Sequence, residues 1–226
     1  MYTRSMEIYD KLYSGKDYRR EAEIVASLVA ARAPHAKTLL DVDCGTGKHL
    51  SHLRSAFQVE GVDVSPEFVE LSRKANPGVR VRVADMVSLR LAERYDVVVC
   101  LFSAIGFVRT PARLKRAVRA MARHITRGGL LIVEPWFEPA DWHPGRPNAT
   151  IVDEPDVKIA RLTTSEQKGI CSVEDLHYLV ATPQGTRHFV ERFIMGLFTQ
   201  EQMLQSFADA GLKAEFVEGG LTGRGL

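Results

Sequence analysis

The stretch TLLDVDCGTGKHLSHL, residues 38–53, determines the fold we expect. It begins with an apolar run typical of a buried strand and continues through the loop Cys44-Gly45-Thr46-Gly47. Leu50 and Leu53 follow three residues apart, as on one face of a helix. The pattern therefore predicts a strand, a tight turn and a helix. Glycines at a helix N-terminus let a ligand approach the backbone, and a doubly wound sheet binds nucleotides there.

Two features of this loop favour a cationic ligand over a dinucleotide. Leu50 stands where the dinucleotide fingerprint has its third glycine, and Asp41 and Asp43 would repel a pyrophosphate. The ammonium and sulfonium groups of S-adenosylmethionine suit such an acidic strand end. The next strand, VEGVDV, ends with Asp63, about twenty residues after the loop, where a carboxylate can bind both ribose hydroxyls. These features indicate a class I methyltransferase, although Asp63 is also placed to cap the following helix.

Composition sets the wider limits. The chain has 226 residues, of which 45% are hydrophobic and 26% charged, so we expect one domain with an appended segment. A net charge of +2 gives no reason to expect nucleic-acid binding. Three well-separated cysteines, Cys44, Cys100 and Cys171, indicate neither a disulfide framework nor a zinc site. Without a signal-like segment or a long apolar window, we expect a cytoplasmic protein with no membrane partner.

The remaining strands and helices extend the α/β pattern. Runs at residues 79–84, 95–101 and 130–134 read as three further strands, and a long helix is expected from Thr110 to about His124. Asp85 and Met86 follow the third strand on the ligand side, where they suit an adenine ring, although Asp85 is also a common turn residue. Phe102 follows the fourth strand. We expect a doubly wound, mostly parallel sheet.

Both ends of the chain supply further expectations. Tyr9, Tyr13 and Tyr18 lie in a glycine-broken segment that suits a lid, or alternatively simple packing on the sheet. After Glu134, an aromatic and proline-rich connection leads to strand-like runs at 159–165, 173–180 and 187–198, which predict a small antiparallel appendage holding the substrate. A helix at 199–210 and a strand at 213–217 follow. We therefore divide the chain into a core with its lid at 1–134, the appendage at 135–198, and a closing helix and strand at 199–226.

The chain resembles the N,N-dimethyltransferases that act on nucleoside-diphosphate amino sugars in macrolide-type antibiotic pathways. The glycine loop is common to all class I methyltransferases, whereas three other segments are more particular to this family. They are Glu134-Pro135-Trp136, His177-Tyr178-Leu179-Val180 and Gly223-Arg224-Gly225-Leu226.

The resemblance implies that the core binds S-adenosylmethionine and that the appendage holds a thymidine-diphospho-sugar, with no metal required. It suggests His124 as the catalytic base, with Tyr9 as a second catalytic candidate that lines the donor site. The expected cofactor-binding residues are Tyr9, Tyr18, Asp41, Cys44, Gly45, Gly47, Asp63, Asp85, Met86 and Phe102. The expected substrate-binding residues are Trp136, Ser165, His177 and Arg224, whose guanidinium would hold the diphosphate.

Two departures from the family pattern limit these expectations. Asp43 replaces a small residue, and the sequence stops at Leu226 where relatives continue into a last strand. An unpaired sheet edge there would fit a truncated chain, a homodimer formed through that edge, or weak activity. Two other functions stay open: an O-methyltransferase of a small hydroxylated natural product, and a non-catalytic cofactor-binding homologue. The particular amino sugar and the number of methyl groups are not encoded in any motif.

Overall fold

A parallel sheet of five strands forms the core of the computed structural model, which describes residues 4–221. The strands are β1 (Thr38–Val42), β2 (Gln58–Asp63), β3 (Arg80–Val83), β4 (Tyr95–Cys100) and β5 (Ile125–Val133), in the order β3-β2-β1-β4-β5. Because the chain order reverses between β1 and β4, their carboxyl ends flank the crevice where such sheets bind ligands. The expected α/β fold is confirmed.

Helices cover both faces of this sheet. They are α2 (Tyr18–Arg32), α3 (Lys48–Leu53), α4 (Pro66–Ala75), α5 (Pro111–Ala122) and the short 3-10 helix η2 (Ala104–Val108). Ser65 and Thr110 cap α4 and α5, each accepting a bond from a backbone amide three residues later, and each helix has proline at its first position. The interior strand β4 is buried on both sides, which explains its continuous apolar run.

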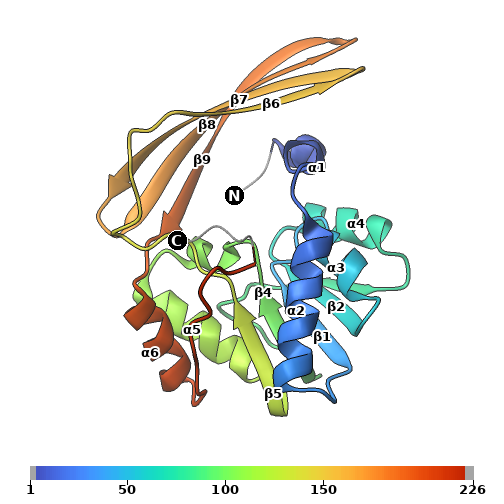
Figure 1. Cartoon of the computed structure of the whole chain (residues 1–226). Coiled ribbons are helices and arrows are strands. Elements are labelled where there is room, and N and C mark those ends of the chain that lie inside the picture. Colours follow the sequence, from blue (N-terminus) through green and yellow to red (C-terminus); the bar gives the residue numbers. More distant parts are fainter. Residues whose placement is uncertain (1–3, 222–226) are drawn as a thin grey trace.

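A second sheet of four antiparallel strands lies above the core in Figure 1. Its strands are β6 (Asn148–Glu154), β7 (Val157–Lys168), β8 (Cys171–Thr182) and β9 (Gly185–Gly196), paired in that order. Tyr178 on the inner face is fully buried, whereas the outer face exposes apolar side chains of all four strands. These exposed residues are Ile151, Leu162, Leu179 and Val190.

The N-terminal segment forms hydrogen bonds with both the antiparallel sheet and the glycine loop of the core. It comprises the 3-10 helix η1 (Met6–Ile8) and α1 (Tyr9–Leu12), drawn in dark blue at the level of the antiparallel sheet in Figure 1. Glu191 on β9 accepts hydrogen bonds from the backbone amides of Arg4 and Ser5. On the other side, Thr46 of the glycine loop donates a 2.7 Å hydrogen bond to Asp10. A segment held at both sheets is well placed to cover what lies between them.

The structure differs from the sequence expectations in several places. Strand β6 was not predicted, and β7 and β8 are longer than their predicted runs, at 12 residues each, whereas β9 has the predicted length but begins two residues earlier. Residues 213–217 form no strand. The expected closing helix is present as α6 (Gln200–Asp209), with a capping box at Thr199. Within residues 4–221, no helix has the length and apolar character needed to cross a membrane.

Candidate active site

A cavity of about 580 Å³ lies where the carboxyl ends of the parallel strands meet the N-terminal segment and the inner face of the antiparallel sheet. Three groups of residues line it. Around the ends of β1 and β2 these are Asp43, Gly45, Asp63 and Phe68, and after β3 and β4 they are Asp85, Met86, Phe102 and Ser103. From the lid and the appendage come Tyr9, Tyr13, Trp136, Arg161, Ser165, Glu174 and Phe193.

Asp63 fixes the glycine loop against the end of β2. Its Oδ2 atom accepts a 2.8 Å hydrogen bond from the amide of Gly45, and its Oδ1 atom accepts one of 2.8 Å from the amide of Ser65. Gly45 has a φ of 55°, and open space surrounds the position of a Cβ atom. Gly47 has a φ of 79°, but there a Cβ atom would collide with Ser72 and Asn76. Gly45 therefore leaves room for a ligand, whereas Gly47 allows close packing on α4.

Three carboxyl groups, those of Asp41, Asp43 and Asp63, gather beside this loop. Burial, with a contribution from the charge of Asp63, raises the pKa of Asp41 to about 7. Burial likewise raises the pKa of Asp43 well above its ordinary value, and the nearby carboxylates of Asp63, Asp41 and Asp85 add to it. The Oδ2 atom of Asp41 is buried and has no hydrogen-bond partner in the described part of the chain. Such a cluster gains stability when a cationic ligand lies beside it.

The neighbouring wall of the cavity is more apolar. Met86 and Val87 are buried, and Phe68 on α4 packs its ring edge against Tyr9, with ring centroids 5.4 Å apart. The backbone amide of Val87 donates a 2.8 Å hydrogen bond to Asp85, whose carboxylate also lies 3.9 Å from Arg113. This combination of a carboxylate and apolar side chains suits a flat aromatic ring that carries an amino group.

Aromatic rings of the lid close the cavity from the N-terminal side. Tyr13 lies between Tyr9 and Phe102, at ring-centroid distances of 4.8 and 5.1 Å. Its hydroxyl oxygen accepts a 3.1 Å hydrogen bond from Arg161 on β7. Burial raises the pKa of Tyr9 well above its ordinary value, so this phenol stays protonated and is unsuited to act as a base.

The antiparallel sheet supplies the opposite wall. The Trp136 indole donates a 3.0 Å hydrogen bond to Ser172 on β8, which fixes the ring against the sheet. Ser165, Glu174 and Phe193 form one register row across β7, β8 and β9, so their side chains lie on the same face. The cavity therefore extends from the glycine loop to the appendage.

Eight of the residues expected from the sequence line this cavity. They are Tyr9, Gly45, Asp63, Asp85, Met86, Phe102, Trp136 and Ser165. Asp41 belongs to β1, Cys44 in the loop is buried, and Gly47 in the loop packs against Ser72 and Asn76. Tyr18 packs edge-on against His49 at a ring-centroid distance of 4.9 Å and carries the Lys16 ammonium over its face. These four residues are not among those that line the cavity.

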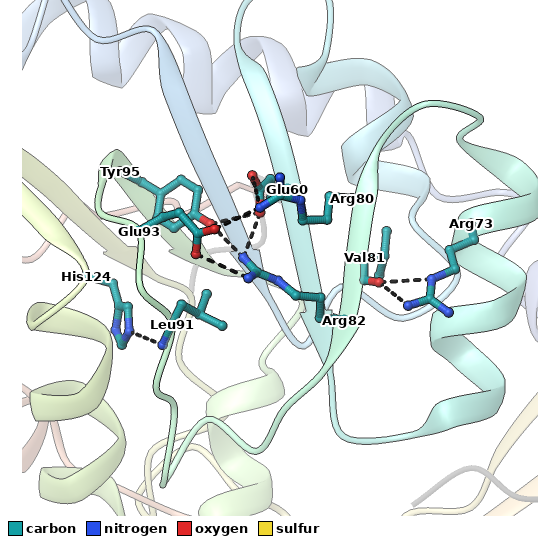
Figure 2. A network of polar contacts seen from close by, with 9 residues as sticks. All are labelled: Glu60, Arg73, Arg80, Val81, Arg82, Leu91, Glu93, Tyr95 and His124. Carbon is teal, nitrogen blue, oxygen red and sulfur yellow. Dashed lines mark hydrogen bonds and ion pairs between the residues drawn. The ribbon is translucent and has the colours of Figure 1, made fainter.

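The structure contradicts the expectation that His124 is the base. His124 is buried, and it lies just before β5, whose opposite, carboxyl end leads to Trp136 in the cavity wall. Its Nε2 atom accepts a 2.9 Å hydrogen bond from the amide of Leu91, drawn in Figure 2, and its Nδ1 atom lies 2.7 Å from the carbonyl of Ala120. Both ring nitrogens thus serve local structure, at the wrong end of the sheet for the reaction.

Two of the residues expected to contact substrate, His177 and Arg224, are not among the described residues that line the cavity. His177 is exposed on the outer face of the antiparallel sheet and stacks on His188 at 5.8 Å, so the prediction that it contacts substrate in the cavity is wrong. It alternates with the inward residues Leu176 and Tyr178, as the period of a strand requires. Arg224 lies outside the described residues.

The inward-facing residues Arg161, Glu174 and Phe193 were missed by sequence reasoning. A signal for Glu174 was present, because in VEDLHYLV the residues 174, 176, 178 and 180 share one face of the strand and the other three are buried. A carboxylate among apolar inward positions indicates a polar ligand or partner.

A second, larger cavity of about 1370 Å³ adjoins the first, and the two share Tyr13, Phe102, Trp136 and Arg161 among their lining residues. It lies between α2, β5 and residues 212–221. The combined space accommodates a ligand much larger than S-adenosylmethionine alone.

Comparison with known proteins identifies the family. A model described as a methyltransferase domain matches residues 39–129. Over 97% of this chain and 88% of the relative, the sequence is 40% identical to dTDP-3-amino-3,6-dideoxy-alpha-D-glucopyranose N,N-dimethyltransferase of Streptomyces fradiae. The chain belongs to the family of dTDP-amino-sugar N,N-dimethyltransferases. A second member, the dTDP-3-amino-3,4,6-trideoxy-alpha-D-glucopyranose N,N-dimethyltransferase of Streptomyces venezuelae, is 38% identical over 97% of this chain and 94% of its own.

Solved structures of the family extend the similarity to the whole fold. The crystal structure of Streptomyces venezuelae DesVI matches with a TM-score of 0.93 and 36% identity, covering 100% of this chain and 97% of that one. The CalS10 amino pentose methyltransferase of Micromonospora echinaspora, solved with S-adenosylmethionine bound, matches with a TM-score of 0.89 and 37% identity, covering 100% and 95%. This family member is therefore an S-adenosylmethionine-dependent methyltransferase, which confirms the expected cofactor.

Proposed function

We propose that the chain transfers methyl groups to the amino group of a dTDP-linked deoxyamino sugar and carries the amine to the dimethylamino stage. The observation that carries this proposal is the near full-length identity to two such enzymes, which includes the appendage that forms one wall of the cavity. Bound S-adenosylmethionine supplies an electrophilic methyl group.

The donor would lie over the glycine loop. Asp63 is placed to bind the ribose hydroxyls, and Asp85 and Met86 to bind the adenine. Asp43 and the orphaned oxygen of Asp41 give the loop the negative charge that a ligand with a sulfonium and an ammonium neutralises. The open space at Gly45 fits a ligand placed against the backbone.

The acceptor would lie under the antiparallel sheet. Trp136 and Ser165 line that part of the cavity, and Arg161 lies where the two cavities meet, so it suits an anionic group of a large acceptor. A sugar nucleotide is bulky enough to use the second cavity. Arg224 stays a candidate for the diphosphate, since its flanking glycines allow a bulky anion to approach.

Catalysis would come mainly from holding donor and acceptor in line. Well-oriented partners gain roughly 7 to 11 kcal/mol relative to a reaction between free molecules. Tyr13, held between Tyr9 and Phe102 and bonded to Arg161, closes the site against water. The amine must also lose a proton before it can attack.

We also propose a cytoplasmic location and a homodimer. The three free cysteines suit a reducing compartment, and the exposed apolar residues on the outer face of the antiparallel sheet suit contact with a second copy. Light scattering on the purified protein tests the second point.

A panel of acceptors tests the proposed activity. The panel contains dTDP-linked 3-amino and 4-amino deoxysugars, the same sugars without dTDP, dTDP-linked sugars without an amine, and small phenols. We expect methylation of a dTDP-linked amino sugar with the highest kcat/KM. Preferred methylation of a phenol or of a hydroxyl group would instead support an O-methyltransferase, and no transfer to any acceptor would support a non-catalytic homologue.

A further inference from the structure

Glu174 is a carboxyl on the inner face of the antiparallel sheet, where Leu176 and Phe193 are its apolar neighbours. Along β8, the inward residues Leu176, Tyr178 and Val180 are all buried. Across the sheet, Glu174 pairs with Ser165 on β7 and Phe193 on β9. All three members of this row line the cavity. The carboxylate therefore faces the space assigned to the acceptor.

A second inward-facing glutamate on the same sheet, Glu191, has a structural role and differs from Glu174 in its hydrogen bonds. Glu191 is buried and accepts hydrogen bonds from the amides of Arg4 and Ser5 and from the Ser5 hydroxyl. In contrast, the side chain of Glu174 makes no hydrogen bond or ion pair with any of residues 4–221. A half-buried carboxylate without a partner is costly, so a ligand is the natural partner for Glu174.

The surroundings of Glu174 also favour the uptake of a proton. Burial raises the pKa of Glu174, and the positive charge of Arg161 opposes this effect. Other charged or titratable groups share the cavity and set the local field. They are Tyr9, Tyr13, Asp43, Asp63, Asp85, Arg113, Asp141, His143 and Arg146 along the cavity wall. Glu191, which is not part of the cavity lining, lies on β9 two residues from Phe193.

Trp136 adds a second feature that suits a cation. Its indole is fixed by the hydrogen bond to Ser172, the inward residue next to Glu174 on β8. An aromatic face and a carboxylate together attract an ammonium group more strongly than a neutral hydroxyl group.

We propose that Glu174 contacts the amino group of the acceptor and takes the proton that the ammonium must lose. This inference rests on the proposed function, because it requires an amine as acceptor. In the step, an N–H bond of the ammonium breaks and an O–H bond forms on the Glu174 carboxylate. The products are a neutral amine with a free electron pair and a neutral carboxylic acid. Glu174 later returns the proton to water, ready for the second methyl transfer.

The test measures pH profiles of kcat and kcat/KM for wild type, Glu174→Gln and Glu174→Asp, with the dTDP-amino sugar that the wild type methylates fastest. Glu166→Gln is the matched control, because Glu166 is an exposed glutamate on the same sheet that pairs with Lys168. Calorimetric affinity for S-adenosylmethionine, measured without acceptor, reports whether each variant keeps an intact donor site.

We expect Glu174→Gln to lower kcat by roughly 100-fold at neutral pH, at the lower end of the range for a general base. The loss should shrink at high pH, where water removes the ammonium proton, and the acidic limb of the kcat/KM profile should disappear. Glu174→Asp should restore that limb with part of the rate. Donor affinity should stay that of the wild type throughout.

Three outcomes would overturn the proposal. An unchanged kcat and pH profile in Glu174→Gln shows that Glu174 handles no proton. A raised acceptor KM with an unchanged kcat and profile shows that Glu174 only binds a polar group of the sugar. A wild-type protein that methylates no amino sugar removes the acceptor on which the proposal depends, and this failure of the proposed function is seen in the wild-type assay before any variant is compared.

Discussion

The carboxylate of Asp63 accepts a hydrogen bond from the amide of Gly45 at 2.8 Å, so the end of β2 and the glycine loop are joined by a residue that lines the cavity. In the proposed donor complex, the same carboxylate binds the ribose. Donor binding and loop geometry would then depend on one side chain.

Replacing Asp63 should weaken the donor complex. We expect Asp63→Ala to lower the affinity for S-adenosylmethionine by roughly 1.5 to 3 kcal/mol, the scale of a hydrogen bond to a charged group. Isothermal titration calorimetry measures this change. Asp96→Ala is the control, because Asp96 also accepts bonds from backbone amides, those of Lys37 and Thr38, but lies at the opposite end of the sheet. Equal donor affinity in wild type and Asp63→Ala would contradict the assignment.

Asp43 should help the site distinguish the donor from the spent product. Its backbone is left-handed, with a φ of 67°, a conformation that asparagine tolerates. Asp43→Asn therefore removes, with little backbone strain, the carboxyl that would ionise beside a bound cation. We expect the affinity for S-adenosylmethionine to fall roughly tenfold, as for loss of one charged contact. The affinity for S-adenosylhomocysteine, which lacks the sulfonium charge, should fall less. Equal losses for both ligands would exclude this role.

Asp41 should make the free protein less stable at high pH. Its pKa is about 7 in the folded protein and 3.8 ordinarily, so the folded state binds more protons between these values. Ionising Asp41 in the folded protein lowers the unfolding free energy. This loss is absent below about pH 4 and complete above about pH 7. We expect Asp41→Asn to have little effect at low pH and to raise the unfolding free energy by up to about 4 kcal/mol at pH 8. Urea unfolding measures both values, and a difference that does not change with pH would contradict the prediction.

His124 should matter for stability and not for turnover. His124→Ala leaves the amide of Leu91 without its acceptor in a half-buried position, which costs roughly 1 to 3 kcal/mol. We expect a lower Tm and an unchanged kcat once the variant is folded. The exposed His35 provides the control, since His35→Ala should change neither quantity. A large fall in kcat with an unchanged Tm would restore His124 as a catalytic candidate.

Local pattern was enough to predict which residues gather around the glycine loop. The strand before Asp41, the turn at Gly45 and the helix after it are each specified by neighbouring residues, and so is the placement of Asp63 and Asp85 at strand ends. The structure places both aspartates at one cavity, as expected.

The acceptor side depends on register, which the sequence does not show directly. His177 and Tyr178 are adjacent in sequence but lie on opposite faces of β8, and only the pairing of β8 with β7 and β9 reveals which face is inward. The prediction for His124 was wrong for a different reason. His124 lies between the end of α5 and the start of β5, at the amino end of the strand, whereas the cavity lies at the carboxyl edge of the sheet. Figure 2 shows it beside the Arg82, Glu60 and Tyr95 network instead, where a buried ring satisfies the backbone of Leu91.

The central claim is that the protein methylates the nitrogen of a dTDP-linked amino sugar, and isotope labelling tests it most directly. The wild-type protein is incubated with S-adenosylmethionine carrying a ¹³C-labelled methyl group and with a dTDP-linked amino deoxysugar, and the product is examined by NMR. We predict two equivalent labelled methyl groups that both couple to the carbon bearing the nitrogen. Label on a sugar oxygen, or no label on the sugar nucleotide, would contradict the account.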